Sequence, residues 1–536
     1  MIINEKRHFA KDPDFVFTAQ QMVERGAIER QIDCSMKKGR HSKNEDGSIN
    51  LKNPENSLSI FKSIPGTCSY WKSYRSELFA RMEQLGPFHL FFTLSCAEQK
   101  WPEVFVSLLH MDAFKVEVHS GWHEDENKIT INGIPLPEFK EHHLPGVTSF
   151  LKDEFVHITR IFDNRLKAFI KNIICAGDVE HYTYRIEFQA RGLPHAHGVI
   201  WLKQDKIKQY LNEEGTFDEE KAVPLIDEWI SVSLENESET LNNLVKNYNV
   251  HKHTKSCLKY GKCRFGFPKV PSPRTIIAVP LPDDMDEKEK EEKLYNAQKT
   301  IDKVMKEIED LGENARDETL NSVLSKLGIS EEKYVNALKI SRKGKVVVLK
   351  RTIHEMYVNN YNDTYLSAWR ANMDIQLCMD VHSVITYITD YVTKDDSGLT
   401  ELLQKALNEK TFTNDFERLN YLKKIYFTYK QVNTCEATYR LINGLCFKGA
   451  NIKKIFVSSN LPQNRSHFFR KVLEIEENGE ENPECVNEED VQELDSNEQE
   501  EQPDTSDDVV EIEGRDGKFR QVKTNFMMPM VQDHLP

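Results

Sequence analysis

The chain has 536 residues, of which 39% are hydrophobic and 29% are charged, and its formal net charge is −15. This length predicts about three or four structural units, and the modest apolar content indicates that part of the chain is solvated helix or tail. No run approaches the roughly 18 consecutive apolar residues of a membrane span, and residues 1–15 lack the apolar core of a signal peptide. We therefore expect no membrane partner.

The negative charge is concentrated near the C-terminus. Between Glu474 and Glu513 the chain has 19 Asp or Glu residues and no Lys or Arg. Because these 19 charges exceed the net charge of −15, the rest of the chain is mildly basic. A mildly basic body is compatible with a phosphate-rich partner. The acidic segment has few apolar residues, so we expect residues 471–536 to be a disordered tail.

The first predicted elements alternate helix and strand. Residues 1–60 mix short helical patterns with a polar loop, and we interpret them as an N-terminal extension. Apolar side chains recur at helical spacing over 70–85, and the Gly-Pro pair that follows ends this helix. The aromatic-rich run 88–96 predicts a buried strand, and 150–175 predicts a second amphipathic helix.

A β-hairpin is predicted next. Along HYTYRIEFQ (181–189), tyrosine, isoleucine and phenylalanine alternate with polar residues, which is typical of a strand with one apolar face. Residues 190–194 contain Gly and Pro and suit a turn. Residues 195–202 then form the returning strand, which places His195 and His197 on the same face.

The polar face of this hairpin is a candidate metal site. A five-residue loop would place Gln189 opposite His195 and Glu187 opposite His197, with facing side chains about 5 Å apart. Two imidazoles and one oxygen ligand with open coordination positions suit a catalytic Mg²⁺ or Mn²⁺. We favour Gln189 as the oxygen ligand because of its position in the hairpin, with Glu187 as the alternative. The alternative interpretation is that the two histidines are ordinary residues of a packed strand.

A helical, acidic segment at 206–247 leads to a compact group of possible zinc ligands. The group falls within 13 residues and consists of His251, His253, Cys257 and Cys263. Four such ligands in a short loop suit tetrahedral Zn²⁺. The spacing is not that of a common zinc finger, however, and a basic loop with incidental thiols is the alternative.

Basic residues surround this group and alternate with Tyr260, Phe265 and Phe267. Cations interleaved with aromatic rings are typical of surfaces that contact a DNA backbone and stack on its bases. The predicted DNA-binding residues are Lys255, Lys259, Lys262 and Arg264.

Residues 284–340 are highly charged and keep a helical apolar stripe, so we predict a helical insertion. A strand at 346–351 and a helix at 381–394 follow. On that helix Tyr387, Tyr391 and Lys394 would share one face. A phenolate can attack phosphorus while a metal polarises the phosphate oxygens and an ammonium neutralises charge. The alternative is that these tyrosines only pack.

Several ordered blocks of the chain resemble the Rep region of Helitron rolling-circle transposons, within the HUH endonuclease superfamily. The resemblance rests on the His-x-His and Tyr-x-x-x-Tyr motifs and extends over roughly residues 60 to 460. The blocks are YWKSYRSELFARMEQLGPFHLFFTLSCAEQKWPEVF (70–105), EFQARGLPHAHGVIWL (187–202), HKHTKSCLKYGKCRFGFPK (251–269), 349–398 and EATYRLINGL (436–445).

The resemblance implies an α+β fold with a central antiparallel sheet flanked by helices. It implies that His195 and His197 bind the divalent metal and that Tyr387 and Tyr391 are nucleophiles. The implied enzyme is a tyrosine DNA endonuclease and strand transferase, which nicks single-stranded DNA at transposon ends and leaves a 5′-phosphotyrosine and a free 3′-OH. Nuclear residence follows from the resemblance to eukaryotic elements.

Full Helitron transposases continue into a helicase, but no G-x-x-x-x-G-K-[ST] phosphate loop occurs here. We therefore expect no ATPase in this chain and a helicase supplied, if at all, by another chain. A catalytically silent, transposon-derived DNA-binding protein is the alternative function. The predicted organisation is an extension (1–60), two parts of the catalytic region (61–250 and 341–470), a zinc-binding element (251–270), a helical insertion (284–340) and the tail (471–536).

Overall fold

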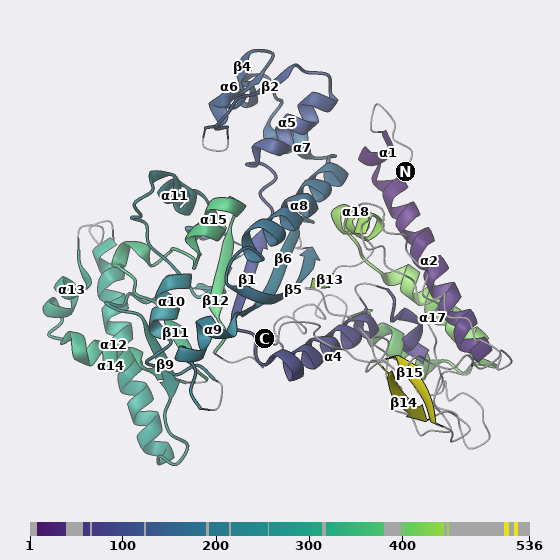
Figure 1. The fold of residues 1–536 in the computed structure, drawn as a ribbon. Helices are drawn as coiled ribbons and strands as arrows, with labels where there is room; N and C mark the ends of the chain where they lie inside the picture. Colours follow the sequence, from purple (N-terminus) through teal and green to yellow (C-terminus); the bar gives the residue numbers. More distant parts are fainter. Residues whose placement is uncertain are drawn as a thin grey trace. The chain divides into compact units, whose positions relative to one another are not determined.

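The computed structural model describes most of residues 8–449 and two short segments near the C-terminus (Figure 1). The described residues are 8–38, 57–64, 67–122, 125–188, 192–213, 216–255, 257–312, 318–342, 344–379, 398–399, 401–443, 447–449, 509–513 and 519–523. The chain divides into two compact units, residues 1–448 and 449–536. None of the helices in these ranges combines the length and the apolar character that crossing a bilayer requires.

A five-stranded sheet forms the centre of the first unit. Its strands lie in the order β12 (Met373–Leu377), β1 (Leu90–Ser95), β6 (Pro194–Leu202), β5 (Val179–Phe188) and β13 (Phe447–Gly449). The pairs β12–β1, β1–β6 and β6–β5 are antiparallel. The strand predicted at 88–96 and the hairpin predicted around residue 192 are therefore confirmed, as is the α+β class with a central antiparallel sheet.

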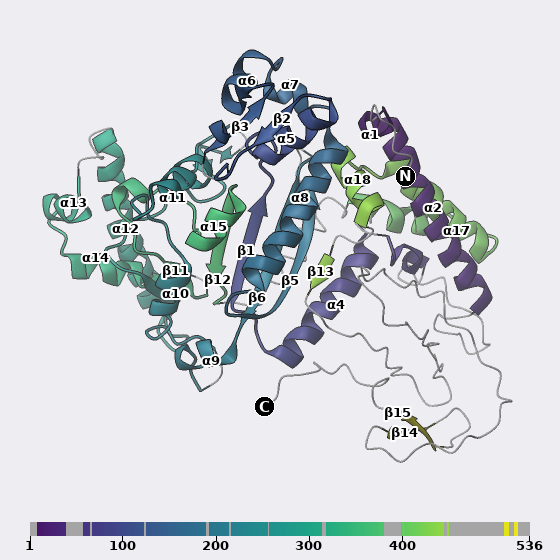
Figure 2. The same ribbon diagram turned by 45° about the horizontal axis from the view of Figure 1, so that its top comes forward.

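Helices cover both faces of this sheet. Helix α8 (Phe155–Phe169), extended by the π-helical turn η3 (Ile170–Ile174), crosses one face (Figure 2). Helix α4 (Cys68–Leu85) contacts the other face; it begins at Thr67, whose hydroxyl accepts a hydrogen bond from the backbone N–H of Tyr70. It ends where predicted, at Gly86, whose φ of 75° is readily adopted only by glycine.

The N-terminal segment packs on elements that come late in the chain. A short helix α1 (His8–Lys11) precedes α2 (Pro13–Lys38), a 26-residue helix that contacts α17 (Asp415–Tyr429) and α18 (Thr434–Asn443). Near this contact η1 (Ser59–Phe61) supplies buried apolar side chains. Glu24 on α2 is buried and ion-paired with Arg440 at 2.9 Å and with Lys430. A buried carboxylate requires such partners, so this contact is specific rather than incidental.

The charged insertion folds as three helices over a small sheet. The helices are α12 (Glu287–Leu311), α13 (Leu320–Lys326) and α14 (Glu331–Leu338). In the sheet, β9 (Ile276–Pro280) pairs in parallel with β10 (Ile340–Ser341) and antiparallel with β11 (Val346–Val348). Val304 and Ile308 of the predicted stripe are buried in a core separate from that of the central sheet. The helical insertion and the strand near 346–351 are thus confirmed.

The remaining elements are short. Between β1 and α8 the chain forms α5 (Pro102–Met111), β2 (Val116–Val118), η2 (Glu126–Lys128), β3 (Ile129–Ile131), β4 (Ile134–Pro135), α6 (Leu136–His142) and α7 (Val147–Leu151). Those of the segment predicted to be helical at 206–247 are α9 (Gln204–Ile207), η4 (Lys208–Tyr210), α10 (Val223–Trp229), α11 (Glu239–Leu244) and η5 (Val245–Asn249). Those after them are β7 (Leu258–Lys259), β8 (Lys262–Cys263), η7 (Ile353–Glu355) and α15 (Asp363–Trp369).

The second unit contains one described element pair. Strands β14 (Val509–Glu513) and β15 (Phe519–Lys523) form an antiparallel hairpin. The sequence did not predict this pairing, because the segment around it is so acidic. The other residues of the predicted tail lie outside the described ranges.

Candidate metal and DNA site

The histidine pair lies on β6, between β1 and β5 of the central sheet. Strand alternation places His195 and His197 on the face that α4 contacts, whereas Ala196 and Gly198 face α8. A Cβ atom on Gly198 would lie 2.3 Å from the ring of Phe92 on β1. The glycine after His197 is therefore required by the close approach of this ring, which packs in the space that a side chain would fill.

The register of the hairpin differs from the prediction by two residues. Glu187 pairs with His195, and Arg185 pairs with His197. The prediction had placed Gln189 opposite His195 and Glu187 opposite His197. Pro194, which the prediction placed in the turn, belongs to β6 instead, because it pairs with Phe188. A shift of two keeps every side chain on its predicted face.

Glu187 is the carboxylate that the structure brings to the histidines. Its Oε2 atom lies 2.7 Å from His197 Nε2 and 3.2 Å from Arg185 Nη2. Burial alone would raise the pKa of Glu187, but the hydrogen bond from His197 and the electrostatic effects of His197 and Arg185 outweigh it and lower this pKa to about 2. The carboxylate is therefore ionised at neutral pH. Gln189 lies outside the described residues.

Burial lowers the pKa of both histidines. Burial, assisted by the neighbouring His197, lowers the pKa of His195 to about 3. Burial also lowers the pKa of His197, against the opposing effect of Glu187. The Nδ1 atom of His195 lies 3.0 Å from Ser95 Oγ on β1. If Nδ1–H donates to this hydroxyl, the Nε2 lone pair of His195 is left available for a cation, which is the usual arrangement for a metal-binding histidine.

His197 Nε2 and Glu187 Oε2 lie close enough together to share a small divalent cation. Metal–ligand distances of about 2.0–2.2 Å would place two adjacent ligand atoms about 3 Å apart. The 2.7 Å separation of His197 Nε2 and Glu187 Oε2 is close to this value, so a cation could replace the shared proton with little movement. The ring centroids of His195 and His197 lie 4.6 Å apart.

Sequence reasoning missed Arg185 and Asp374. Arg185 was counted only as part of the polar face of β5, yet its side chain is 2% exposed and its guanidinium lies 5.0 Å from the ring of Trp71 on α4. Asp374 lies on the same sheet face, paired with Thr93, which is itself paired with His197. Burial raises the pKa of Asp374 to about 6. Only strand pairing between distant segments brings Asp374 here, so no local pattern could have revealed it.

The proposed nucleophiles, Tyr387 and Tyr391, and Lys394 lie outside the described residues. The chain leaves β12 at Leu377, ten residues before Tyr387. Ten residues can span at most about 35 Å, whereas β12 is separated from β6 by β1 alone, which corresponds to about 10 Å. The connection therefore permits either tyrosine to reach the histidines.

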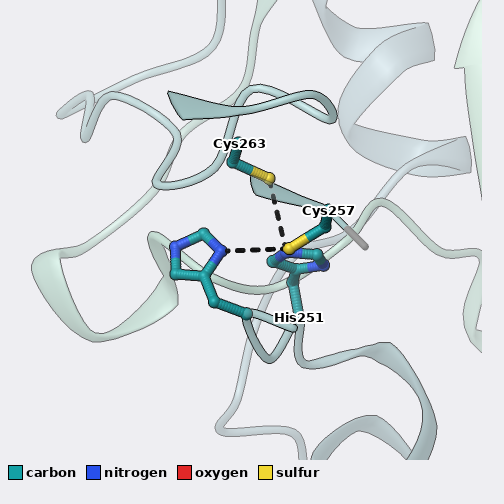
Figure 3. A group of neighbouring side chains, drawn as sticks. His251, Cys257 and Cys263 are labelled. Carbon is teal, nitrogen blue, oxygen red and sulfur yellow. Dashed lines mark hydrogen bonds between the residues drawn. The ribbon is translucent and has the colours of Figure 1, made fainter. Parts of the chain in front are cut away.

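The predicted zinc ligands converge. The ligand atoms of His251, His253, Cys257 and Cys263 all lie within 4.8 Å of one another. Figure 3 shows His251, Cys257 and Cys263 directed toward a common centre. The Nε2 atom of His251 lies 3.4 Å from Cys263 Sγ. The Nδ1 atom of His253 lies 3.6 Å from Cys257 Sγ.

These separations suit a tetrahedral ion. Bond lengths of about 2.0–2.3 Å to nitrogen and sulfur imply ligand–ligand distances of roughly 3.3–3.8 Å. The group could therefore hold a metal ion such as Zn²⁺. Among the described residues, it is the one His/Cys/Asp/Glu group whose ligand atoms are already gathered in this way.

The residues around this group that were predicted to contact DNA divide into two kinds. The four predicted DNA-binding residues, Lys255, Lys259, Lys262 and Arg264, are all exposed. Phe267, in contrast, is buried and stacks on His251 with ring centroids 4.5 Å apart. Its predicted role as a stacking surface for bases is therefore wrong, because its ring is already covered.

Comparison with known families agrees with the resemblance seen in the sequence. Residues 1–200 match the family model described as the Helitron helicase-like domain at N-terminus. This part of the chain is therefore similar to a Helitron helicase-like N-terminal domain. The match begins at residue 1, so the N-terminal 60 residues lie within it. A search of curated proteins found no match.

The Helitron-like domain contains His195, His197 and Glu187, together with strands β1, β5 and most of β6. The match relates the chain to the proteins of Helitron transposons. The His/Cys group and β12 lie beyond the matched residues, and the tertiary structure joins them to the matched part through the central sheet.

Proposed function

We propose that the chain is a metal-dependent, Rep-type tyrosine endonuclease and strand transferase of the HUH superfamily, acting on single-stranded DNA at Helitron ends. The observation that carries this proposal is the position of Glu187 Oε2, 2.7 Å from His197 Nε2, beside the second imidazole, His195, on the central sheet. The match to the Helitron helicase-like domain supports the same reaction class.

His195, His197 and Glu187 would hold the catalytic Mg²⁺ or Mn²⁺, which would polarise the scissile phosphate when bound. Arg185 and Ser95 would fix the orientation of Glu187 and His195. The phenolate oxygen of Tyr387 or Tyr391 would attack phosphorus, forming the Tyr O–P bond as the P–O3′ bond breaks. The departing oxygen takes a proton and becomes the free 3′-OH. A later attack by a 3′-OH reverses these bonds and rejoins a strand.

The decisive experiment is adduct formation. A single-stranded oligonucleotide carrying a Helitron end, incubated with Mn²⁺ or Mg²⁺, should give a covalent protein–DNA band that resists denaturation. The band should disappear in His195→Ala/His197→Ala and in the double variant Tyr387→Phe/Tyr391→Phe. No band at any metal concentration would contradict the enzyme proposal, and a band unchanged in the tyrosine variant would refute these nucleophiles.

A catalytically silent DNA-binding protein is the second candidate. The observation that favours it is the assembled His/Cys group with its exposed basic residues, which requires none of the catalytic residues. DNA binding with a steep salt dependence, but no adduct, would support this function over nicking. In either case we propose that Zn²⁺ holds the His/Cys group together, that the protein acts in the nucleus and that any helicase is supplied by another chain.

A further inference from the structure

A small hairpin projects from the His/Cys element, which we define as residues 251–269. Strands β7 and β8 pair Leu258 with Cys263 and Lys259 with Lys262. The two residues between them, Tyr260 and Gly261, have φ angles of 52° and 77°. Two consecutive positive φ angles are those of a type I′ turn, which favours Asn or Gly at both positions. A tyrosine adopts such a conformation only at an energetic cost, so packing or function must favour it here.

Packing does not explain this tyrosine. Tyr260 is 94% exposed, and Phe265, just beyond the hairpin, is 49% exposed. Each ring lies beside a cation: Lys259 Nζ is 5.7 Å from the centroid of Tyr260, and the Arg264 guanidinium is 4.6 Å from that of Phe265. The hairpin therefore presents two aromatic rings to solvent, each flanked by positive charge.

The surrounding charge has one sign. Residues 251–269 include six Lys or Arg and no Asp or Glu. Such a surface is complementary to a polyanion, and its exposed rings offer stacking surfaces for bases. In a duplex the faces of the bases are already stacked on one another. Unpaired bases can therefore stack on these rings, whereas the paired bases inside a double helix cannot.

Hydrogen bonds attach the element to the edge strand of the central sheet. Two residues before it begins, Asn249 donates a hydrogen bond to Met373 O at 3.1 Å and accepts one from Met373 N at 3.2 Å, which links the chain to β12. The backbone N–H of His251 donates to Tyr357 O, and that of Lys269 donates to Met356 O. Both ends are pinned to the chain that leads into β12, so the hairpin stands at a defined position relative to the sheet that carries the histidines.

We propose that the β7–β8 hairpin is a platform selective for single-stranded DNA, on which bases stack against Tyr260 and Phe265 while phosphates contact Lys259, Lys262 and Arg264. The metal ion of the His/Cys group would hold the base of this platform. The inference rests on the proposed function for its biological meaning, because it names the part of the protein that would hold the strand to be nicked.

The platform can be tested by binding alone, without Mg²⁺ or Mn²⁺. The full chain is titrated against a fluorescent oligothymidylate and against a duplex of equal length, and anisotropy gives each dissociation constant. Tyr260→Asn is chosen because Asn accepts the positive φ of the turn, and it is combined with Phe265→Ala. Stacking contributes about 1–3 kcal/mol per base, so the double variant should bind oligothymidylate at least about tenfold more weakly.

A matched control lies on helix α12. Tyr295 is also exposed, at 63%, and the Nζ atom of Lys299 also lies 5.7 Å from its ring. Because α12 is rich in acidic residues, Tyr295→Ala should leave the binding of oligothymidylate unchanged. Unchanged metal content and melting temperature would confirm that the double variant remains folded, as expected for the removal of two exposed rings.

Two results would overturn the platform: oligothymidylate bound within twofold by the double variant, or equal losses for single-stranded and duplex DNA. The adduct assay separates this failure from failure of the proposed function. If the double variant binds oligothymidylate normally and still forms adducts, the platform is refuted but the nuclease proposal stands. If the double variant loses single-strand binding and the unmodified protein forms no adduct, the platform proposal stands but the nuclease proposal is refuted.

Discussion

Asp374 gives the sharpest prediction for stability. The Oδ1 atom of this residue is buried and has no hydrogen-bond partner within the described part of the chain, while Oδ2 accepts from Gln376 Nε2. Burial raises its pKa from the ordinary value of 3.8 to about 6, although Gln376 and Lys269 partly oppose this effect. Ionised Asp374 therefore destabilises the fold, and we predict that Asp374→Asn stabilises the protein at neutral pH.

The magnitude follows from the pKa shift. Between pH 3.8 and about pH 6 the folded chain holds a proton that the unfolded chain releases, so stability falls as pH rises through this window. A shift of about two units corresponds to at most about 3 kcal/mol. Because the side chain retains partial exposure, we expect Asp374→Asn to add about 1–2 kcal/mol near pH 8 and almost nothing below about pH 4.

Urea unfolding followed by tryptophan fluorescence measures this effect. All six tryptophans lie in residues 1–448, so their emission reports on the unit that contains Asp374. Asp284→Asn, at an exposed position, controls for the loss of one charge. The reasoning would be refuted if the variant were less stable than the natural protein near pH 8. It would also be refuted if the free energy of unfolding changed by the same amount near pH 8 and below about pH 4. If adduct formation falls while stability rises, Asp374 contributes to the site at the expense of the fold.

Three other perturbations test neighbouring features. Gly198→Ala should destabilise the protein by at least about 1–3 kcal/mol in urea unfolding, because the new Cβ would overlap the buried ring of Phe92; no change in the unfolding midpoint would contradict this. Glu187→Gln should weaken Mn²⁺ binding, measured by calorimetry, about tenfold or more, and more than Gln189→Ala does; the reverse order would make Gln189 the ligand. Cys263→Ser should abolish stoichiometric zinc in the purified protein, and zinc that persists would place the ion elsewhere.

The hairpin shows what strand alternation can predict. Period-two patterning determined which side chains of β5 and β6 share a face, because alternation depends only on backbone geometry. It did not determine the register, which depends on where the loop begins and on the cross-strand contacts. The prediction consequently placed Glu187 among the possible ligands but paired it with the wrong histidine.

The His/Cys group was predictable for a different reason. Its four ligands fall within 13 residues, so a short loop brings them together without help from distant elements. The basic residues and aromatic rings were predictable for the same reason, because they lie in the same short stretch of sequence. It could not distinguish Phe267, which stacks on His251, from Tyr260 and Phe265, which face solvent, because burial depends on how the loop closes.

By itself, the sequence determined the α+β class, the histidine hairpin, the His/Cys group and the likeness to the Helitron family, since each depends on local periodicity, local spacing or ordered motifs. Only the tertiary structure placed Ser95 and Asp374 on the histidine face, through the pairing of β1 with β6 and β12. Only the tertiary structure, too, showed that Arg185 is buried against Trp71 of α4. Contacts between segments up to about 280 residues apart follow from the packing of the whole chain, and no local pattern encodes them.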